Sequence, residues 1–498
     1  METKPSFSEF KMMAEQGNLI PVYQEFMADT ETPVSAYLKI RDKSFSYLLE
    51  SADAGGPTER DGKTWGRYSF IGCKPFLMAI SRGLEMEIVE GNEKKIVKDA
   101  GNPLNVLKDL IEKFKPVTVK DLSQFQGGLV GYFNYDLVRK WEYLPGISPE
   151  DEKFPESVFM VSRRLIIFDH LTHKIKVVSF AHLRKNDKLK EIYDLAYQDI
   201  NETIDELQRP LFSIPPGNPF SISDLEASFS REGFEEAVRK AKDYIVAGNV
   251  IQVVLSQRFS GNKTGDDLTI YRNLRSINPS PYMFYLNFGE IKLIGSSPEI
   301  LVRLTDRKIE LRPIAGTRHR GESPENDQDL EKELLADPKE KAEHIMLVDL
   351  GRNDVGKVAM PGSVTVPRLM EVERYSHVMH IVSRVEGLLK PEMDGFDLFR
   401  ATFPAGTVTG APKIRAMEII NELEPSPRGP YAGAVGYFGF NDNMDFCITI
   451  RTIIVFKNRL SFQVGAGIVA DSVPEVEYHE TLSKGEAMLS ALEMATKS

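Results

Sequence analysis

The chain has 498 residues, about three domains' worth of sequence, and its 42% hydrophobic and 27% charged residues are typical of globular proteins. This composition excludes extended disorder, a collagen-like repeat and a coiled coil. Asp and Glu number 73 against 62 Lys and Arg, so the net charge of −11 argues against a protein that binds nucleic-acid phosphates regardless of sequence.

Residues 21–183 consist mostly of short runs of alternating polarity, which predict strands. Two stretches are typical of hairpins, 84–98 around Gly91-Asn92 and 164–180 around residues 170–173. Residues 186–206 have helical spacing, and four prolines follow, at positions 210, 215, 216 and 219. This proline cluster predicts a boundary. We therefore expect an N-terminal region (1–207), a Pro-rich linker (208–228) and a C-terminal domain (229–498).

The C-terminal part alternates meanders and helices. We expect a helix over 234–246 with Ser230 as its N-cap. A meander should follow over 282–313, with turns at 289–290 and 305–306. Further helices are predicted at 337–350, at 411–423 and from 472 onward, and further strands at 432–440, 445–456 and 460–464. Strands joined by tight turns pair antiparallel, so the predicted fold class is α+β, with large antiparallel β-sheets and helices outside.

Cysteine content and the N-terminus suggest a cytoplasmic protein. Cys73 and Cys447 are too few for a disulfide framework or a cysteine-built zinc site, and they fit a reducing compartment. Residues 1–17 lack the apolar core of a signal peptide. No run of about 18 apolar residues predicts a membrane span.

Two acidic helix faces are the first candidate site. Glu340 and Glu343 are three residues apart, as are Glu477 and Glu480, so each pair lies on one helical face. Together the two faces would suit a hard cation such as Mg²⁺. The alternatives are solvated surfaces and capping boxes, in which Asp337 would pair with Glu340 and residue 472 with residue 475.

Arg451 is the second candidate, because residues 446–454 have the pattern of a strand buried on both faces. A guanidinium in such a strand requires an anion. This anion could be a substrate carboxylate held in bidentate fashion or an internal Asp or Glu. The sequence leaves both alternatives open.

Glycine-rich segments and single polar residues complete the candidates. Residues 403–413 place glycines before a helix start, a typical anion site, but Ala411 breaks the spacing of a phosphate loop. Residues 465–467 (Gly-Ala-Gly) would let a ligand approach the backbone. His380 is either a functional or a structural histidine, and Glu299 either a general acid or a turn residue.

Five segments together resemble the chorismate-utilising enzymes, and among them most closely the family of anthranilate synthase component I. They are 313–318 (PIAGTR), 349–354 (DLGRND), 373–380 (ERYSHVMH), 403–413 (FPAGTVTGAPK) and 465–472 (GAGIVADS). The resemblance implies a layered α/β/β/α sandwich with two interleaved subdomains. It also implies a reaction, in which chorismate and ammonia give anthranilate and pyruvate with Mg²⁺ as the cofactor.

The resemblance also implies roles for individual residues. Glu343 and Glu480 would be direct metal ligands, with Glu340 and Glu477 acting through water. Glu299 would be the general acid, and His380 would serve the elimination of pyruvate. The residues implied in substrate binding are Thr317, Thr407, Tyr431, Arg451, Gly465, Ala466, Gly467 and Lys484.

Two positions distinguish relatives within this family. Isochorismate and salicylate synthases resemble this chain but carry a lysine base at the position of Gln252. An amide cannot deprotonate water. Ala315 stands where aminodeoxychorismate synthases carry a nucleophilic lysine. These two positions favour ammonia as the nucleophile. The rival interpretations are an aminodeoxychorismate synthase and a non-catalytic amino-acid sensor.

Partners and regulation follow from the resemblance. Neither cysteine has the setting of an amidotransferase nucleophile, so a separate glutamine amidotransferase subunit is expected, in a heterotetramer with two of each chain. Residues 48–51 (LLES) and 278–283 (NPSPYM) resemble the family's feedback site for L-tryptophan. The implied inhibitor-binding residues are Leu49, Glu50, Ser51, Pro281, Tyr282, Met283, Val435 and Tyr437.

Overall fold

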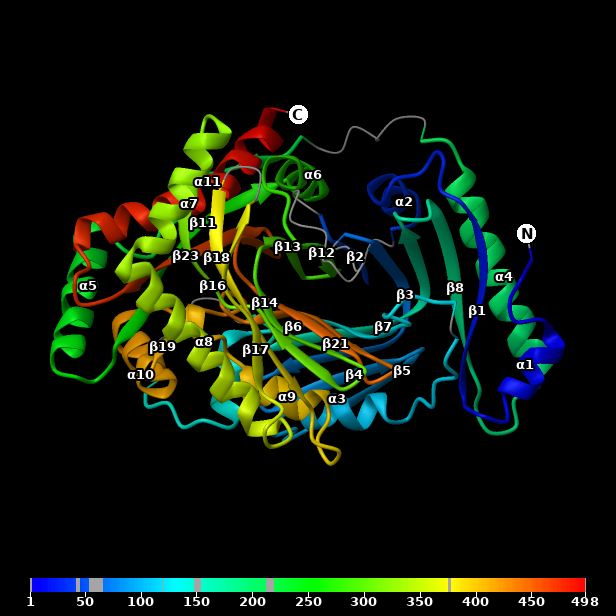
Figure 1. The fold of residues 1–498 in the computed structure, drawn as a ribbon. Coiled ribbons are helices and arrows are strands. Elements are labelled where there is room, and N and C mark those ends of the chain that lie inside the picture. Colours follow the sequence, from blue (N-terminus) through cyan, green and yellow to red (C-terminus); the bar gives the residue numbers. More distant parts are fainter. Residues whose placement is uncertain are drawn as a thin grey trace.

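The computed structural model describes residues 2–41, 45–52, 66–119, 121–146, 154–211, 219–374 and 378–497 (Figure 1). The N-terminal strands are β1 (Leu19–Met27), β2 (Phe45–Glu50), β3 (Tyr68–Arg82), β4 (Glu85–Glu90), β5 (Glu93–Val97), β6 (Gly128–Phe133), β7 (Ser157–Asp169) and β8 (Lys174–His182). The helices beside them are α1 (Phe7–Met13), α2 (Pro33–Ile40), α3 (Pro103–Ile111), the 3₁₀ turn η1 (Tyr135–Lys140) and α4 (Leu189–Gln208).

The remaining strands follow in the second half of the chain. They are β9 (Ser221–Ile222), β10 (Glu226–Ala227), β11 (Gln252–Thr264), β12 (Tyr282–Phe288), β13 (Ile291–Ser297), β14 (Ile300–Thr305), β15 (Lys308–Leu311), β16 (Ile314–His319), β17 (Thr365–Arg374), β18 (Val378–Leu388), β19 (Gly410–Ala411), β20 (Ala434–Gly439), β21 (Met444–Ile448), β22 (Thr452–Phe456) and β23 (Arg459–Ile468). The helices are α5 (Arg231–Val246), α6 (Leu268–Ile277), α7 (Pro324–Ala336), α8 (Pro338–Val358), α9 (Gly395–Thr402), η2 (Gly406–Val408), α10 (Lys413–Leu423) and α11 (Pro474–Lys497).

Most of the predicted elements are confirmed. Both predicted hairpins form, as β4–β5 and β7–β8. Of the predicted meander, the hairpins β12–β13 and β14–β15 form with their turns where expected, but β13 pairs with β22 and β14 with β21, so the strands do not continue as one meander. The Ser230 hydroxyl caps α5 by accepting a hydrogen bond from the Gly233 N–H at 3.0 Å. Of the proline cluster, residues 212–218 lie outside the described residues, so the boundary stays a prediction.

The strands form one hydrogen-bonded system that divides into two branches. One branch runs β4, β3, β7, β6, β20, β21, β14, β15, β18, and the other runs β1, β8, β7, β3, β2, β12, β13, β22, β23, β11. Both contain β3 and β7, whose pairing shifts between Pro75 and Leu77. Such an irregularity bends strands, so β3 and β7 serve both branches.

Apolar side chains fill the space between the branches and under the helices. The largest cluster joins Leu286 and Leu293 from one branch with Val130 and Leu304 from the other. A second cluster packs α2, α6 and α11 against the outer face of β2, β12 and β22. This arrangement confirms the predicted α+β fold with antiparallel sheets and helices outside (Figure 1).

The chain passes from one branch to the other at two neighbouring places, between β13 and β14 and between β21 and β22. β13 pairs with β22, where Gly295 is opposite Thr452, and β14 pairs with β21, where Ile300 is opposite Cys447. The single strand predicted over 445–456 is therefore wrong, because the chain leaves one branch after Ile448 and enters the other at Thr452. Both halves of this segment are buried, so hydrophobic periodicity could not reveal the crossing.

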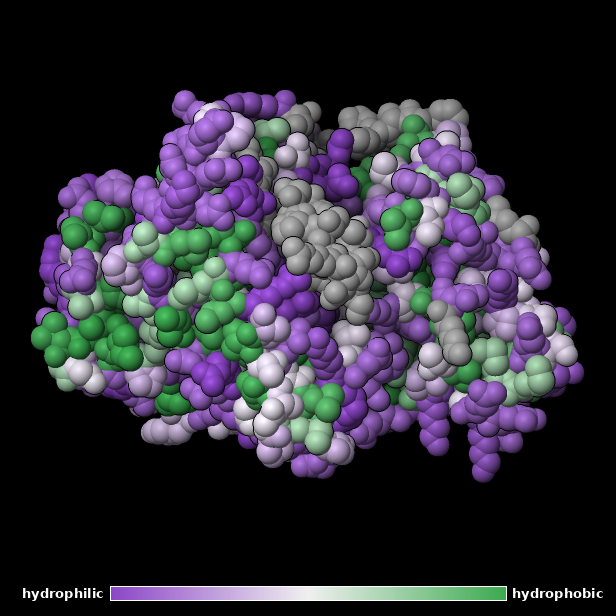
Figure 2. Space-filling model, viewed as in Figure 1, coloured by the Kyte–Doolittle hydropathy of each residue, from purple (hydrophilic) through white to green (hydrophobic). Residues whose placement is uncertain are grey.

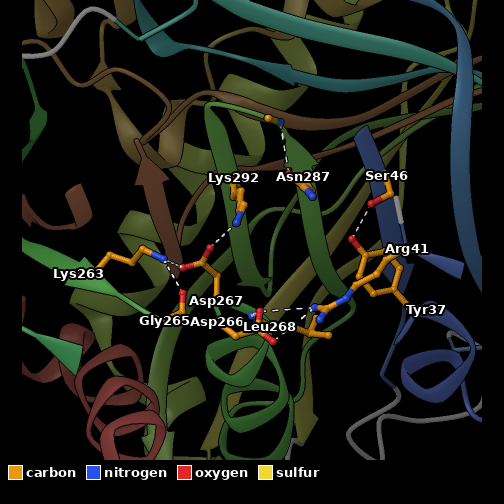
Figure 3. A network of polar contacts seen from close by, with 11 residues as sticks. Tyr37, Arg41, Ser46, Lys263, Gly265, Asp266, Asp267, Leu268, Asn287 and Lys292 are labelled. Atoms are coloured by element: carbon orange, nitrogen blue, oxygen red, sulfur yellow. Dashed lines mark hydrogen bonds and ion pairs between the residues drawn. The ribbon is translucent and has the colours of Figure 1, made fainter. Parts of the chain in front are cut away.

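Polar contacts tie α2 and β2 to the start of α6 (Figure 3). Arg41 pairs with Asp266 at 3.4 Å, and the Tyr37 and Ser46 hydroxyls lie 2.7 Å apart. The neighbouring Asp267 is buried and forms ion pairs with Lys263 and Lys292. A buried carboxylate is stable only when it is paired in this way. The Arg41–Asp266 ion pair is the contact of this group that joins the N-terminal segment to the C-terminal one.

The surface is mixed, with one apolar area. Figure 2 shows apolar side chains gathered on its left side, over α5, α8 and α10. Exposed apolar residues in these helices are Val246, Ile345 and Ile414. In the part of the chain that the structure describes, no helix combines the length and apolarity that a membrane crossing requires.

Candidate active site

Glu299 and Arg451 both lie at the point where the chain crosses between the branches. The Ser296 N–H donates to the Arg451 carbonyl at 3.1 Å, and the Ile448 N–H donates to the Glu299 carbonyl at 3.0 Å. Arg451 has a φ of +50°, a left-handed conformation that non-glycine residues rarely adopt. The crossing therefore fixes both residues through the backbone.

The Arg451 guanidinium contacts a carbonyl group. Its Nη1 donates to the Lys484 carbonyl at 2.6 Å, and within the described ranges no carboxylate forms an ion pair with it. Burial lowers the pKa of Arg451, and Tyr431 opposes this shift. A buried cation whose described contacts include no anion favours the substrate-carboxylate alternative over an internal Asp or Glu.

Glu299 lines a pocket with about 410 Å³ of free space, part of it open to solvent. Gly406, Thr407 and Arg312 also line it, together with apolar residues of α8. Burial raises the pKa of Glu299 to about 7, against the lowering effects of the Thr407 hydroxyl and the Lys484 ammonium. A carboxyl group with a pKa near neutrality can hold a proton and donate it, as a general acid must.

Other residues pack closely against the Gly-Ala-Gly segment of β23, beside β11. A Cβ at Gly465 would lie 2.7 Å from the Tyr431 hydroxyl, and one at Gly467 would lie 2.6 Å from Nε2 of Gln252. At position 465 the backbone carbonyl of Leu255 is also only 2.9 Å away, so glycine is required there. At position 467 a side chain would displace the flexible end of Gln252. Lys484 donates to the Gly465 carbonyl at 3.0 Å, and burial raises the pKa of Tyr431 to about 12. Ala466 is fully buried, so Gly465 and Gly467, which are partly exposed, are the residues of this segment that a ligand could approach.

The four candidate metal ligands lie in two pairs at the starts of α8 and α11. Glu343 accepts from Gln252 Nε2 at 3.1 Å, and Glu340 accepts from Arg318 at 3.4 Å. Glu480 pairs with Lys484 at 2.7 Å. Burial first, and then the neighbouring Glu343 or Glu480, raise the pKa of Glu340 and Glu477. Each pair therefore holds two carboxylates close enough to repel each other.

The two carboxylate pairs do not form one cluster by themselves. Among the described residues, no group of three or more His, Cys, Asp or Glu side chains is gathered as in a metal centre. An ideal Cβ at Gly467 would lie 4.0 Å from Oε1 of Glu343, so the α8 pair adjoins the Gly-Ala-Gly segment. The Glu477 Oε2 is buried without a hydrogen-bond partner. Such an atom is costly and is a feature expected of a cation site.

Both predicted capping boxes are wrong. Asp337 does cap α8, accepting from the N–H groups of residues 339 and 340, but the Glu340 carboxylate pairs with Arg318 instead of returning to residue 337. Glu475 pairs with Arg231 at 2.6 Å, and the Ser472 N–H donates to a backbone carbonyl. In both helices an arginine elsewhere in the chain competes successfully for the carboxylate, which the local sequence could not show.

His380 lies on β18 between β16 and β17. Its Nδ1 is 3.1 Å from the Gly316 carbonyl oxygen and 3.0 Å from the Thr317 hydroxyl. A carbonyl only accepts, so Nδ1 carries the hydrogen and Nε2 is the basic nitrogen of the neutral ring. Burial lowers the pKa of His380, as does Arg451, while the Gly316 carbonyl and Glu373 oppose these effects. The ring is therefore neutral and oriented at pH 7.

The predicted inhibitor residues lie where β2, β12 and β20 approach one another. Glu50 is opposite Met283, and Leu49 is opposite Phe284. The Tyr282 hydroxyl donates to Asp445 at 2.8 Å, and Asp445 is the strand partner of Tyr437. Val435 lies on the same strand as Tyr437, and Pro281 immediately precedes β12.

Glu50 already has partners in this structure. Arg275 binds both of its oxygens, at 2.9 and 3.1 Å, and the Tyr271 hydroxyl donates to it at 2.6 Å. An amino group arriving at Glu50 would therefore compete with Arg275. The Ser51 hydroxyl is buried and has no hydrogen-bond partner, so it is the polar atom here that a ligand could satisfy.

Sequence reasoning missed the buried Arg428–Glu424 pair. Arg428 binds both oxygens of Glu424, at 2.9 and 2.6 Å, and donates to the carbonyls of Val408 and Val254 at 2.6 and 2.7 Å. Its guanidinium also lies over the Tyr431 ring. The pair thus joins the glycine-rich loop, β11 and Tyr431. The signal in the sequence, an arginine four residues after a glutamate across a proline-rich turn, is not specific.

Comparisons with known proteins show the family of the chain. The sequence profile of the family described as chorismate binding enzyme matches residues 60–490. The chain is 45% identical to anthranilate synthase component 1 of Acetivibrio thermocellus, over 99% of both chains. It is 46% identical to that of Aquifex aeolicus, over 100% of this chain and 99% of the relative.

Solved structures agree as well. Anthranilate synthase component I from Streptococcus pneumoniae superimposes with a TM-score of 0.76 at 34% identity, covering 93% of this chain and 98% of that one. MenF, the menaquinone-specific isochorismate synthase from Escherichia coli, shares the fold with a TM-score of 0.69 at 19% identity, covering 97% of this chain and 98% of that one. The chain therefore belongs to the chorismate-binding enzymes and, within them, to the family of anthranilate synthase component 1.

Proposed function

We propose that this chain converts chorismate and ammonia to anthranilate and pyruvate, the first step of tryptophan biosynthesis. The observation that carries the proposal is Glu299, a carboxyl group with a pKa of about 7 that lines a pocket and lies within the electrostatic influence of the Lys484 ammonium. The Arg451 guanidinium in turn contacts the Lys484 carbonyl. The cations suit a substrate with two carboxylates, and the protonated acid suits a leaving hydroxyl.

Substrate binding, protonation of the leaving group and removal of the ring proton are assigned to different residues. Arg451, Tyr431, Thr407 and the backbone at 465–467 hold the carboxylates, with Thr317 and Lys484 beside them. Ammonia adds at ring carbon C2 while Glu299 protonates the departing C4 hydroxyl. His380 then takes the C2 proton through Nε2, and the ring becomes aromatic as pyruvate leaves. Gln252 offers no base for activating water, and Ala315 offers no nucleophile, which supports ammonia as the attacking group.

The carboxylates of α8 and α11 fit Mg²⁺. Glu343 and Glu480 would hold it directly, and Glu340 and Glu477 through water. Oxygen donors of this kind are the ligands that Mg²⁺ prefers, and the unpartnered Oε2 of Glu477 supports the assignment. When bound, the ion would withdraw electron density from the ring carboxylate of the substrate.

Ammonia would come from a separate glutamine amidotransferase chain, in a heterotetramer with two of each subunit. Cys73 and Cys447 are both buried, and burial raises the pKa of the Cys447 thiol, so neither has the character of a nucleophile. The apolar face over α5, α8 and α10 supports a protein partner, since such patches mark interaction sites (Figure 2).

The test is an assay of the isolated chain. With chorismate, Mg²⁺ and ammonium chloride it should form anthranilate, followed by its fluorescence, and with glutamine in place of ammonium it should form none. A metal chelator should abolish the activity, and excess Mg²⁺ should restore it. A stable 4-amino product, or no turnover with ammonium, would contradict the proposal.

Tryptophan would inhibit by binding where residues 1–207 meet the C-terminal part, at Leu49, Glu50 and Ser51 on one side and residues 281–283, Val435 and Tyr437 on the other. This location supports the proposed division into a regulatory region (1–207), a linker (208–228) and a catalytic domain (229–498). A ligand that spans two packed parts can favour one packing over another.

Replacing Ser51 with phenylalanine is expected to relieve tryptophan inhibition. The Ser51 hydroxyl is buried, so a phenyl ring would occupy the space of the ligand. The concentration of tryptophan that halves activity should rise by about tenfold or more, the loss of roughly 1.4 kcal/mol or more of binding, while turnover changes little. Ser51→Ala is the matched control for the lost hydroxyl. Unchanged inhibition of Ser51→Phe would show that the effector binds elsewhere.

A further inference from the structure

His380 lies in the middle of a row of three residues across the sheet. Thr317 on β16 is opposite His380 on β18, and Glu373 on β17 is opposite it from the other side. Residues directly opposite each other on antiparallel strands have Cβ atoms about 4.5–5.5 Å apart and point to the same face. The imidazole therefore lies between a hydroxyl that contacts Nδ1 and a carboxylate.

Glu373 is placed for an electrostatic role. Its side chain is 14% exposed and forms an ion pair with Arg312, which is 12% exposed and lines the same pocket as Glu299. In such surroundings charges act more strongly than in water. Arg451, on the other hand, opposes a positive charge on His380. Among the described residues, the charged groups that shift the pKa of the imidazole are thus Arg451 from the strand crossing and Glu373 from β17.

We propose that Glu373 is a positioning residue for His380: the Glu373 carboxylate stabilises the imidazolium that forms when His380 takes a proton from the aminated ring. This inference rests on the proposed function. In that step the C2–H bond breaks and its proton passes to Nε2, while the electron pair forms the ring double bond. The bond from the ring to the enolpyruvyl oxygen breaks, and the released enolate takes up a proton to give pyruvate. The negative charge of Glu373 offsets the repulsion between Arg451 and the positive charge that forms on His380.

Arg312 moderates this effect. Its guanidinium neutralises part of the Glu373 charge, so removing Glu373 and removing Arg312 should move the basicity of His380 in opposite directions. Without the carboxylate, His380 becomes a weaker base and stays neutral to lower pH. Without the arginine, less of the carboxylate charge is neutralised, and His380 becomes protonated at higher pH.

The experiment measures chorismate consumption and anthranilate formation separately, from pH 5 to pH 9, with ammonium and Mg²⁺. In Glu373→Gln, anthranilate formation should fall about tenfold, a part of the about 10²–10⁴-fold effect of a positioned acid or base. Chorismate consumption should fall less, so the aminated intermediate accumulates. The acidic limb of the anthranilate profile should move to lower pH in Glu373→Gln and to higher pH in Arg312→Met, and Glu373→Asp should recover part of the rate.

Glu371→Gln is the matched control. Glu371 lies two residues earlier on β17, on the same face, with a 54% exposed side chain and a 3.9 Å contact to Arg368. It should behave as the unmodified chain. If both rates fall equally in Glu373→Gln and the acidic limb stays in place in both Glu373→Gln and Arg312→Met, the proposal is wrong.

His380→Met separates this inference from the proposed function. The variant lacks the base and should accumulate the aminated intermediate. If it forms anthranilate in step with chorismate consumption, the role proposed for His380 fails. If it accumulates the intermediate while Glu373→Gln does not, the role of His380 stands and only the inference about Glu373 fails.

Discussion

Glu299→Gln is expected to reduce anthranilate formation by about 10²–10⁴-fold, the range for loss of a positioned general acid. Glutamine has nearly the same shape as glutamate but has no proton to give to the departing hydroxyl. The Lys484 and Thr407 groups that face Glu299 would remain in place. Ammonium-dependent turnover at saturating chorismate is the measurement, and the loss should appear in kcat, because substrate binding depends on other residues.

The pH dependence should follow from the same carboxyl group. Glu299 acts as an acid only while it is protonated, and its pKa is raised by burial to about 7. Its contribution to turnover should therefore be present below pH 7 and be lost as the pH rises through 7. In Glu299→Gln this limb of the profile should disappear. A limb that persists in the variant would assign it to another group.

At alkaline pH, Glu299→Gln should raise the stability of the chain although it lowers the activity. Between the usual pKa of 4.5 and about 7, the folded chain holds a proton on Glu299 that the unfolded chain has released. Folding stability from this group is therefore full below pH 4.5 and is lost as the pH rises to 7, by roughly 3 kcal/mol for the complete shift. Glu299→Gln removes this loss, so at pH 8 the variant should withstand more urea than the unmodified chain.

Glu290→Gln is the control for this pair of measurements. Glu290 lies in the turn between β12 and β13 with a 60% exposed side chain that pairs with Arg82. An exposed pair of this kind contributes about 0–1 kcal/mol. The control should leave the activity and its pH profile unchanged. Equal stability of Glu299→Gln and the unmodified chain at pH 8 would show that the Glu299 carboxyl is not held in a costly environment.

The sequence predicts the elements of this fold well because each is determined locally. The Gly-Asn pair at residues 91–92 is enough to predict the turn of the β4–β5 hairpin. Ser230 caps α5, as its position before the helix predicts. Alternation of polar and apolar residues also identifies the antiparallel strands. None of these signals reports which strands share a sheet, and the two branches follow from the shared bent strands β3 and β7 instead.

The site was harder to derive for the same reason. The sequence singles out Arg451 as a charge in a buried segment and Glu299 as a carboxyl group after a strand. Their common location depends on two passages of the chain between the branches, which periodicity does not show. The glycines at 465 and 467 indicate that another group lies close to the backbone, but the sequence does not say which group. In the structure these groups are Tyr431 and Gln252. The roles of Glu343, Glu480 and His380 came from the resemblance to known enzymes, and the geometry adds the contacts that orient these side chains.

Arg428→Met is expected to destabilise the chain by about 3–5 kcal/mol, the cost of leaving a buried charge without its partner. Arg428 is 2% exposed, and Glu424, its partner, is 5% exposed. Methionine fills much of the space but leaves Glu424 with only the Ser256 N–H and hydroxyl as donors. Urea unfolding should show the loss. Arg415→Met on α10 is the control, since its pair with Glu418 is 37% and 27% exposed, and it should cost about 0–1 kcal/mol.

A double variant separates the charge from the packing. Arg428→Met with Glu424→Leu removes both buried charges, so it should be more stable than Arg428→Met alone, although the carbonyls of Val408 and Val254 still lose their donor. Arg428 holds the carbonyl of Val408 in the glycine-rich loop and that of Val254 on β11, and its guanidinium lies over the Tyr431 ring. Because this loop and Tyr431 are proposed to bind the substrate, the double variant should bind chorismate more weakly, seen as a raised KM. A double variant that is less stable than the single one would contradict the assignment of the lost stability to an unpaired Glu424. Unchanged KM in the folded double variant would mean that Arg428 stabilises the chain without holding the loop, β11 and Tyr431 in register.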